Sequence, residues 1–347
     1  MRVLIIGGTG LISGSITRML KRQGHAVTVF HRGYRPLEVK GVTELIGYRQ
    51  NRLKFETQMR ALEFDAVFDM ISFSAADAAS SLRAFQGRVN QFIHCSTVCA
   101  VGAPLTKIPA DEDEPYQPVS LYGRGKAAAE KLLLRAWRRN NFPVTIFRPS
   151  HTYGPGAHWV LGTLMQDWNK DCSLFNRILR RQPILVQGDG EQLWQSCYVD
   201  EVAEGFVGAL GKKRVLGQIY NICGSEICTW NQYYVRVAKA LGRKAILAHL
   251  PTAVIMAHAP KSSTGFLKDI AQYHGAYSNA KIMRDIPEFR PRTTIEQGSR
   301  MHLAWLKKKG SLRNAPDRLF EDQLCHLAFS LEKRIDLIRR TPWGHCR

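Results

Sequence analysis

The fold follows from residues 1–33, "MRVLIIGGTGLISGSITRMLKRQGHAVTVFHRG". Val3 to Ile6 form a short apolar run, which is typical of a parallel strand that is buried on both faces. A glycine cluster follows, and apolar residues then recur at helical spacing as far as Gly24, which ends the helix. Val27 to Phe30 form a second apolar run. The stretch therefore predicts a strand, a glycine turn, a helix and a second strand.

The glycine turn has the pattern of a dinucleotide site. Gly7 and Gly10 match the first two glycines of a GxxGxxG motif, and Ser13 takes the third position. Gly7 allows the tight turn, and Gly10 lets the backbone approach a pyrophosphate at the start of the helix. The third position serves close packing of helix on strand, for which serine is small enough. A turn between a strand and a helix makes such a motif informative.

The same alternation continues along the chain. Residues 64–72, 89–97 and 142–150 are further apolar runs, and a helix is expected at about 75–85. Strands that alternate with helices predict an α/β fold, a Rossmann-like doubly wound parallel sheet. Ligands of such sheets bind outside the carboxyl ends of the strands.

The helix at residues 120–139, "SLYGRGKAAAEKLLLRAWRR", starts with Tyr122 and Lys126. Their spacing of four residues puts the phenol and the ammonium on one face of the helix. Such a pair also arises by chance in many helices, so the pattern becomes informative only with the rest of the chain.

Composition limits the function classes. The 347 residues are 45% hydrophobic, which indicates a globular chain. Their net charge of +20 would attract a polyanion or a phosphorylated small molecule. No apolar run has the length of a membrane span, and the eight cysteines show no metal-binding spacing. The first residues enter a strand without a basic leader. We expect a cytoplasmic protein with no metal.

Several motifs in order resemble the short-chain dehydrogenase/reductase superfamily, specifically its extended NAD-dependent epimerase/dehydratase branch. They are "GGTGLIS", "CSTVCAVG", "YGRGK", "FRPSHTYGPG", "GDGEQLWQSCYVDEVA" and "YNICGSE". The resemblance covers about residues 1–300. It implies a Rossmann domain at 1–151 joined by about 191–225, and a smaller substrate domain at 152–190 and 226–310. Residues 311–347 lie outside the resemblance, and their helical periodicity predicts a basic helical extension.

The resemblance also assigns site residues. Tyr122 falls on the catalytic tyrosine of the branch, Lys126 on its lysine and Thr97 on its serine/threonine. A phenol is a poor base near neutral pH, but Lys126 and the positive charge of a nicotinamide would lower its pKa. Tyr122 would then act as acid/base while hydride moves to or from the nicotinamide. Implied cofactor contacts are Gly7, Thr9, Gly10, Leu11, Ile12, Arg32, Ile71, Ser72, Ser96, Tyr122, Lys126 and Pro149; implied substrate contacts are Ser72, Thr97, His151 and Trp194.

The chain also departs from the branch. Val98 and Cys99 stand where 4,6-dehydratases carry an acidic pair, which leaves elimination chemistry without support. Tyr48 takes the place of an aspartate near the adenine. Trp194 stands near the position of an arginine that binds the substrate diphosphate, and we expect it to stack on a base or a sugar face.

The identity of the nicotinamide cofactor depends on the end of the second strand. An NAD site usually has an acidic residue there for the ribose hydroxyls. This chain has no Asp or Glu between Gly10 and Glu38, and Arg32 could pair with a 2′-phosphate instead. The alternative is that Arg32 stacks on adenine or points to solvent. We expect NADP or NAD, with a modest preference for NADP.

Two classes of function stay open. The first is an NAD(P)-dependent oxidoreductase or epimerase that acts on a carbinol carbon of a sugar nucleotide or related sugar. The second is an RNA-binding or regulatory protein of the chloroplast stem-loop-binding type, which shares the glycine turn and suits the charge of +20. The trio of Thr97, Tyr122 and Lys126 favours the enzyme. Whether the chain forms a homodimer stays open.

Overall fold

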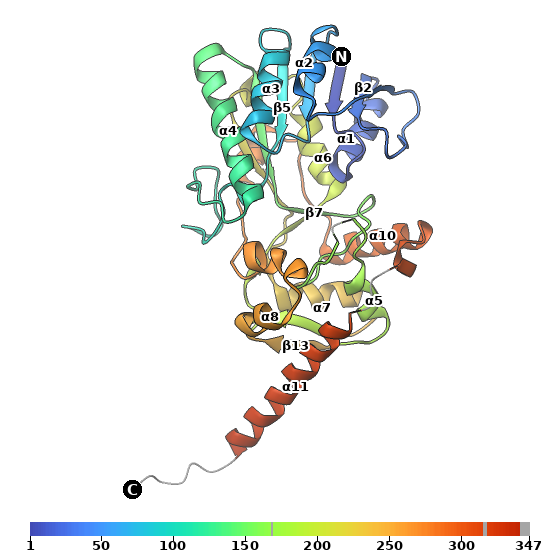
Figure 1. Ribbon diagram of the computed structural model, residues 1–347, viewed down its shortest axis with the longest axis vertical. Coiled ribbons are helices and arrows are strands. Elements are labelled where there is room, and N and C mark those ends of the chain that lie inside the picture. Colours follow the sequence, from blue (N-terminus) through green and yellow to red (C-terminus); the bar gives the residue numbers. More distant parts are fainter. Residues whose placement is uncertain (168, 315–317, 341–347) are drawn as a thin grey trace. The chain divides into compact units, whose positions relative to one another are not determined.

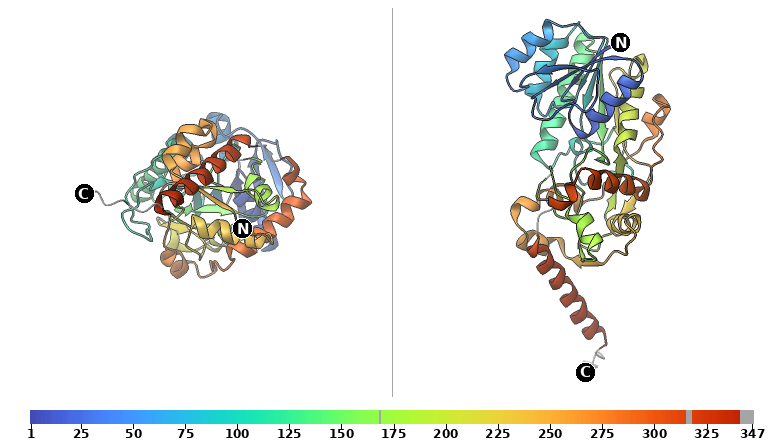
Figure 2. Two further views of the ribbon diagram at one scale, coloured as in Figure 1. Left: turned by 90° about the horizontal axis from the view of Figure 1, so that it is seen from below. Right: turned by 90° about the vertical axis from the view of Figure 1, so that its right-hand side faces the viewer.

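A computed structural model describes residues 1–167, 169–314 and 318–340 and divides the chain into two compact units (Figures 1 and 2). Unit 1 consists of residues 1–156, 195–227 and 276–294, and unit 2 of residues 157–194, 228–275 and 295–347. Within the described residues no helix is both long enough and apolar enough to cross a membrane.

Unit 1 contains the predicted parallel sheet. Within its described residues, seven strands pair in the order β11-β6-β5-β4-β1-β2-β3, and all the pairings are parallel. The strands are β1 (Arg2–Ile6), β2 (Ala26–His31), β3 (Thr43–Ile46), β4 (Ala66–Asp69), β5 (Gln91–Cys95), β6 (Val144–Pro149) and β11 (Ile219–Ile222). The first strand of the chain, β1, lies inside the sheet, with β2 and β3 on one side of it and β4, β5, β6 and β11 on the other. The strand order therefore reverses between β1 and β4, and doubly wound folds bind their ligands at such a point.

Helices cover both faces of this sheet. The helices of unit 1 are α1 (Leu11–Arg22), α2 (Arg52–Arg60), α3 (Ala75–Phe85), α4 (Leu121–Asn140), α6 (Val199–Gly208) and α9 (Ala280–Asp285). Helices α1 and α6 pack side by side on one face, and α2, α3 and α4 follow one another on the other face. Val3 and Ile5 of β1 belong to the apolar core under α1 and α6, whereas Leu4 and Ile6 belong to the core under α2, α3 and α4. Alternate residues of a strand point to opposite faces, so β1 is apolar throughout.

Unit 1 extends further along the chain than the sequence predicted. Residues 276–294 were expected in the second domain, but they return to unit 1. The reason is apolar burial, since Ile282, Ile286 and Phe289 complete the core on the α1 and α6 face. Two short strands of unit 1, β7 (His151–Tyr153) and β10 (Ser196–Tyr198), pair in parallel just beyond the carboxyl edge of the main sheet.

Unit 2 is built around one apolar core that includes Trp194 and Trp230. Its strands are β8 (Ile184–Gln187), β9 (Leu193–Trp194), β12 (Cys228–Thr229) and β13 (Leu247–Leu250), and its helices are α5 (Ser173–Leu179), α7 (Trp230–Ala240), α8 (Thr252–His258), α10 (Ile295–Lys308) and α11 (Leu319–Arg340). Strands β8 and β13 pair in parallel, and β9 and β12 pair antiparallel.

The expected extension at 311–347 is in part a core element of unit 2. Leu324, Cys325 and Ala328 of α11 are buried in the core of this unit. Arg177 also forms an ion pair with Asp322 of α11 at 2.7 Å. Residues 315–317 and 341–347 lie outside the described part of the chain.

Candidate active site

The turn between β1 and α1 has a conformation that requires its glycines. Gly7 has a φ of 90°, and a Cβ atom at this position would lie 2.4 Å from Cγ2 of Ile71. Ser13 fixes the turn from inside, because its hydroxyl donates to the carbonyl of Gly7 at 2.7 Å and accepts from the amide of Gly10 at 2.9 Å. Serine in the third position therefore forms hydrogen bonds that a third glycine could not form.

This turn fits a dinucleotide phosphate. Gly10 is the N-cap of α1, so the first amides of the helix face the carboxyl edge of the sheet with their positive dipole end. Thr9, Leu11 and Ile12 surround the turn as partly buried residues. Ser72, which follows β4, is fully buried, and its hydroxyl has no partner among the residues that the structure describes. An orphaned buried hydroxyl next to Ile71 is the kind of group that a bound cofactor would satisfy.

Helix α4 brings Tyr122 and Lys126 to the same edge. Ser120 caps its first turn by accepting from the amide of Gly123 at 2.9 Å. The two glycines of "YGRGK" are both required, because a Cβ on Gly123 would lie 2.3 Å from the carbonyl oxygen of Cys99, and one on Gly125 would lie 2.2 Å from that of Phe73. The first turn of α4 therefore packs directly on two backbone segments that follow strands β4 and β5.

Lys126 is buried below this surface. It is 1% exposed, and its Nζ donates to the carbonyl oxygen of Cys95 at 2.5 Å. The same atom lies 4.8 Å from the ring centre of Phe73 and 5.9 Å from that of Tyr122. Burial lowers the pKa of Lys126, although Asp69 and Glu130 oppose the shift. Phe73 was not predicted from the sequence, since a lone exposed aromatic in a loop gives no pattern.

Tyr122 and Thr97 meet above Lys126. Thr97 follows β5, is 8% exposed and accepts a hydrogen bond from the amide of Cys99 at 3.2 Å. The Tyr122 side chain is 46% exposed, and the protein atoms packed around its hydroxyl raise the pKa of Tyr122 above its usual value through desolvation. A hydrogen bond with Thr97 opposes that shift. The protein's own groups thus keep the phenol protonated at neutral pH.

A buried ionic network supports the site from beneath. Ser96 donates to Glu130, which pairs with Arg148 at 2.7 Å and accepts from the hydroxyl of Tyr116 at 2.8 Å. Glu130 and Arg148 are both fully buried. Ser96 was expected at the cofactor, but its hydroxyl donates to Glu130 of this network. The sequence contained a signal for this network, because Glu130 stands four residues after Lys126 and therefore lies on the same face of the helix.

Two further predicted residues lie at the same edge. Pro149 ends β6 and is buried. His151 starts β7, where its Nδ1 is 3.3 Å from the hydroxyl of Ser196 and its ring stacks on Tyr153. Strand β6 is adjacent to β5, so Pro149 at its end and His151 just beyond it belong to the edge that holds Thr97.

Arg32 forms an exposed cluster with two tyrosines at the ends of β2 and β3. Its guanidinium carbon lies 5.1 Å from the ring centre of Tyr34. The hydroxyls of Tyr34 and Tyr48 are 3.1 Å apart. Tyr48 stands where the branch usually has an aspartate, so this corner of unit 1 presents a cation and two phenols instead of a carboxylate.

Trp194 is a core side chain of unit 2. It is 6% exposed, and its ring stacks on Trp230 with centres 4.5 Å apart and packs edge-on against Phe266. An indole packed between aromatic rings of the core has little surface left for a sugar or a base. The expectation that it stacks on substrate came from its place after the GDG turn, and we do not include it in the site.

The assembled groups can perform acid–base chemistry beside a dinucleotide. A phenol, a hydroxyl and a buried ammonium converge where the strand order reverses, next to a glycine turn that can hold a pyrophosphate. All of these residues belong to unit 1.

Comparison with known proteins identifies the family of this chain. Residues 3–223 match the model of the NAD dependent epimerase/dehydratase family. A 2'-dehydrokanamycin reductase of Streptomyces kanamyceticus is 28% identical over 91% of this chain and 87% of its own length. A chloroplast stem-loop binding protein of 41 kDa of Arabidopsis thaliana is 28% identical over 70% of this chain and 63% of its own. The crystal structure of a Thermotoga maritima UDP-glucose 4-epimerase has the same fold, with a TM-score of 0.71 and 22% identity over 89% of this chain and 99% of that one.

Proposed function

This chain belongs to the NAD dependent epimerase/dehydratase family, and from this premise we propose that it oxidises or reduces a carbinol carbon of a sugar nucleotide or related sugar, with Tyr122 as acid/base. The observation that supports the proposal most is the convergence of Tyr122, Thr97 and Lys126 beside the glycine turn. A nicotinamide bound in this turn would supply the acceptor or donor of hydride.

Tyr122 exchanges the proton of the substrate hydroxyl. When a carbinol is oxidised, its C–H hydrogen leaves as hydride and its O–H proton passes to the Tyr122 oxygen; reduction of the ketone runs the same steps in reverse. Thr97 orients the reacting oxygen by hydrogen bonding. Because burial raises the pKa of Tyr122, the phenolate needs additional positive charge in the working site.

Lys126 supplies part of that charge. Its Nζ is held by the carbonyl of Cys95 and lies under the Tyr122 ring. Its pKa is lowered by burial, so it donates a proton more readily than a surface lysine does. The remaining donor positions of the ammonium are directed to the cofactor ribose in this proposal.

The relatives point to two kinds of substrate. The UDP-glucose 4-epimerase favours a sugar nucleotide, whereas the 2'-dehydrokanamycin reductase, which covers more of this chain than the stem-loop binding protein does, favours a keto group on a sugar without a nucleotide. Val98 and Cys99 follow Thr97 in place of an acidic pair, so we do not propose elimination of water. We retain both substrate classes within one reaction type.

For the cofactor we propose NADP(H) ahead of NAD(H). Arg32 lies at the end of β2, where a carboxylate would select the ribose hydroxyls of NAD, and its guanidinium is exposed. Tyr34 supports the guanidinium through its ring face. The RNA-binding alternative rests on the charge of +20 and on one relative. It assigns no function to Thr97, Tyr122 and Lys126, and we therefore do not favour it.

Substitution of Tyr122 by Phe tests the proposal. We expect turnover to fall by about 10²-fold or more, with cofactor affinity nearly unchanged, because only the proton-transfer group is lost. Tyr220→Phe is the matched control, since Tyr220 lies on the edge strand β11 and its hydroxyl donates to Asp285 of α9. Turnover is measured with UDP-glucose plus NAD for epimerisation, and with a ketosugar plus NADPH at 340 nm. Equal turnover of Tyr122→Phe and Tyr220→Phe would remove Tyr122 from the chemistry.

A further inference from the structure

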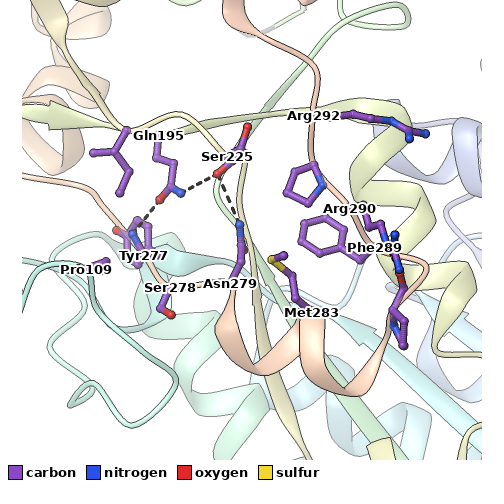
Figure 3. A pocket seen from close by; sticks show the side chains of 14 residues that line it. Pro109, Gln195, Ser225, Tyr277, Ser278, Asn279, Met283, Phe289, Arg290 and Arg292 are labelled. Atoms are coloured by element: carbon purple, nitrogen blue, oxygen red, sulfur yellow. Dashed lines mark hydrogen bonds between the residues drawn. The ribbon is translucent and has the colours of Figure 1, made fainter.

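Unit 1 contains a hollow whose lining includes none of the residues of the proposed chemistry. It has a volume of about 760 Å³, within the range of small-molecule sites. Most of its lining comes from residues 224–227 and 277–292, beyond the segment that matches the family model. Figure 3 shows Gln195 and Tyr277 toward one end, Phe289, Arg290 and Arg292 toward the other, and Ser225, Asn279 and Met283 between them.

The walls of this hollow are fixed by hydrogen bonds. Gln195 is buried, accepts from the amide of Tyr277 at 2.8 Å and donates to the carbonyl of Gly224 at 2.7 Å. The side chain of Asn279 accepts from the amide of Cys223 at 3.0 Å and donates to its carbonyl at 2.7 Å. Because both amide side chains are engaged in this way, the hollow is preformed, and ligand binding requires little ordering.

The chemistry of the lining is apolar with a positive end. Ile227 is 41% and Met283 is 50% exposed, so both side chains offer apolar surface to a ligand in the hollow. All fourteen lining residues belong to the described part of the chain; they include two arginines and no carboxylate. Arg290 donates from Nε to the carbonyl of Pro287 at 3.0 Å, which orients its guanidinium.

Arg292 also has an acidic neighbour. Burial raises the pKa of Glu204, and the nearby Arg292 lowers it in part. The main-chain amide of Arg292 donates to Glu201 at 2.8 Å, so the backbone at this end is held in place. Of the two arginines, Arg290 is therefore the stronger candidate to pair with an anion.

The position of the hollow along the chain gives it a second property. The chain passes between the two units after residues 156, 194, 227, 275 and 294. The lining contains Gln195, Ile227, Tyr277 and Arg292, which lie close in sequence to the last four of these five passages. A ligand in the hollow would therefore contact residues of unit 1 that lie next to these passages in the sequence.

We propose that this hollow binds a small amphipathic anion, an organic carboxylate, sulfonate or phosphate with an apolar body, on the crossing segments of unit 1. The apolar body lies against Ile227 and Met283, and the anionic group lies at Arg290 and Arg292. The site is separate from the glycine turn and independent of the reaction proposed above.

Two fluorescent probes test this proposal. 8-Anilinonaphthalene-1-sulfonate is an aromatic anion, and N-phenyl-1-naphthylamine is its uncharged counterpart. Each is titrated into the full chain with NADP+ in excess, so that the glycine turn is occupied. We expect the double substitution Arg290→Ala and Arg292→Ala to weaken binding of the sulfonate about tenfold, since each exposed charge contributes modestly to affinity. Binding of the neutral probe should be unchanged.

The control is Arg284→Ala, because Arg284 is an exposed arginine of the same segment that pairs with Asp285 at 2.9 Å and does not line the hollow. Hydrogen exchange then locates the sulfonate, with protection expected at residues 224–227 and 276–292. Protection elsewhere, or equal sulfonate affinity in the double variant and the control, would overturn the proposal.

Discussion

Replacement of Gly125 by alanine tests the packing on which the site depends. Gly125 lies between Tyr122 and Lys126 in α4, and a Cβ there would lie 2.2 Å from the carbonyl oxygen of Phe73. Gly14 of α1 is the matched position, since it is also within a helix but its Cβ would meet only the flexible end of Arg18, at 3.8 Å.

The expected magnitude follows from these two environments. Alanine is more favourable than glycine inside a helix by about 0.5–1 kcal/mol, and both variants gain this amount. At Gly125 the contact must open by roughly 1 Å, and such overpacking costs about 1–3 kcal/mol. Gly14→Ala should therefore be more stable than the wild type, and Gly125→Ala should be less stable than Gly14→Ala by about 1–3 kcal/mol.

Urea denaturation measures both free energies of unfolding, and steady-state kinetics measures turnover. The shift of α4 carries Tyr122 and Lys126 with it, so we also expect Gly125→Ala to lose up to about 100-fold in turnover, as misplacement by about 1 Å can do. Gly14→Ala should keep wild-type turnover. If Gly125→Ala were as stable and as active as Gly14→Ala, the close approach of α4 to Phe73 would be refuted.

Three further changes test other parts of the structure. Arg32→Ala should weaken NADP(H) roughly 10- to 100-fold through loss of one charge-assisted contact and leave NAD(H) unaltered; titration of both cofactors measures this, and tighter wild-type binding of NAD(H) would count against Arg32. Glu130→Gln should cost about 3–5 kcal/mol of stability in urea, because it leaves Arg148 buried without its counter-charge; a loss below about 1 kcal/mol would contradict the network. Burial lowers the pKa of His302 to about 4, so the folded state stays neutral while the unfolded state binds a proton below about 6.5. Stability should therefore be complete above pH 6.5 and fall by about 3 kcal/mol toward pH 4, and this fall should be smaller in His302→Gln, as calorimetry at several pH values would show; parallel curves would exclude His302 as the cause.

Local signals in the sequence predicted most of unit 1. The helix that was expected at about residues 75–85 is α3, Ala75–Phe85, in the structure. Ser74 is its N-cap and accepts a hydrogen bond from the amide of Asp77. The strands were found because their apolar runs are buried on both faces of the sheet. The spacing of Tyr122 and Lys126 put both residues on one face of a helix, and both lie in the first turns of α4; their assignment to the site came from the resemblance.

Long-range packing explains what the sequence did not predict. The return of residues 276–294 to unit 1 depends on Ile282 and Phe289, whose partners are more than fifty residues away in the chain. Trp194 was assigned to substrate by its distance from a motif, but its environment is set by Trp230 on another element. The glycines of "YGRGK" could not be explained either, since the carbonyl groups they accommodate come from two other loops.

The discontinuous make-up of unit 1 has a consequence for how the protein is synthesised. Strand β11 and the core residues of 276–294 emerge from the ribosome long after the six strands that they complete. At ~5–20 residues per second, synthesis of residues 224–294 takes roughly 4–14 s. During this interval the face that later receives Ile282, Ile286 and Phe289 is exposed to water, because the nascent chain has nothing yet to cover it. The nascent protein is therefore expected to be a client of holding chaperones, and slower translation of this stretch should lengthen that dependence.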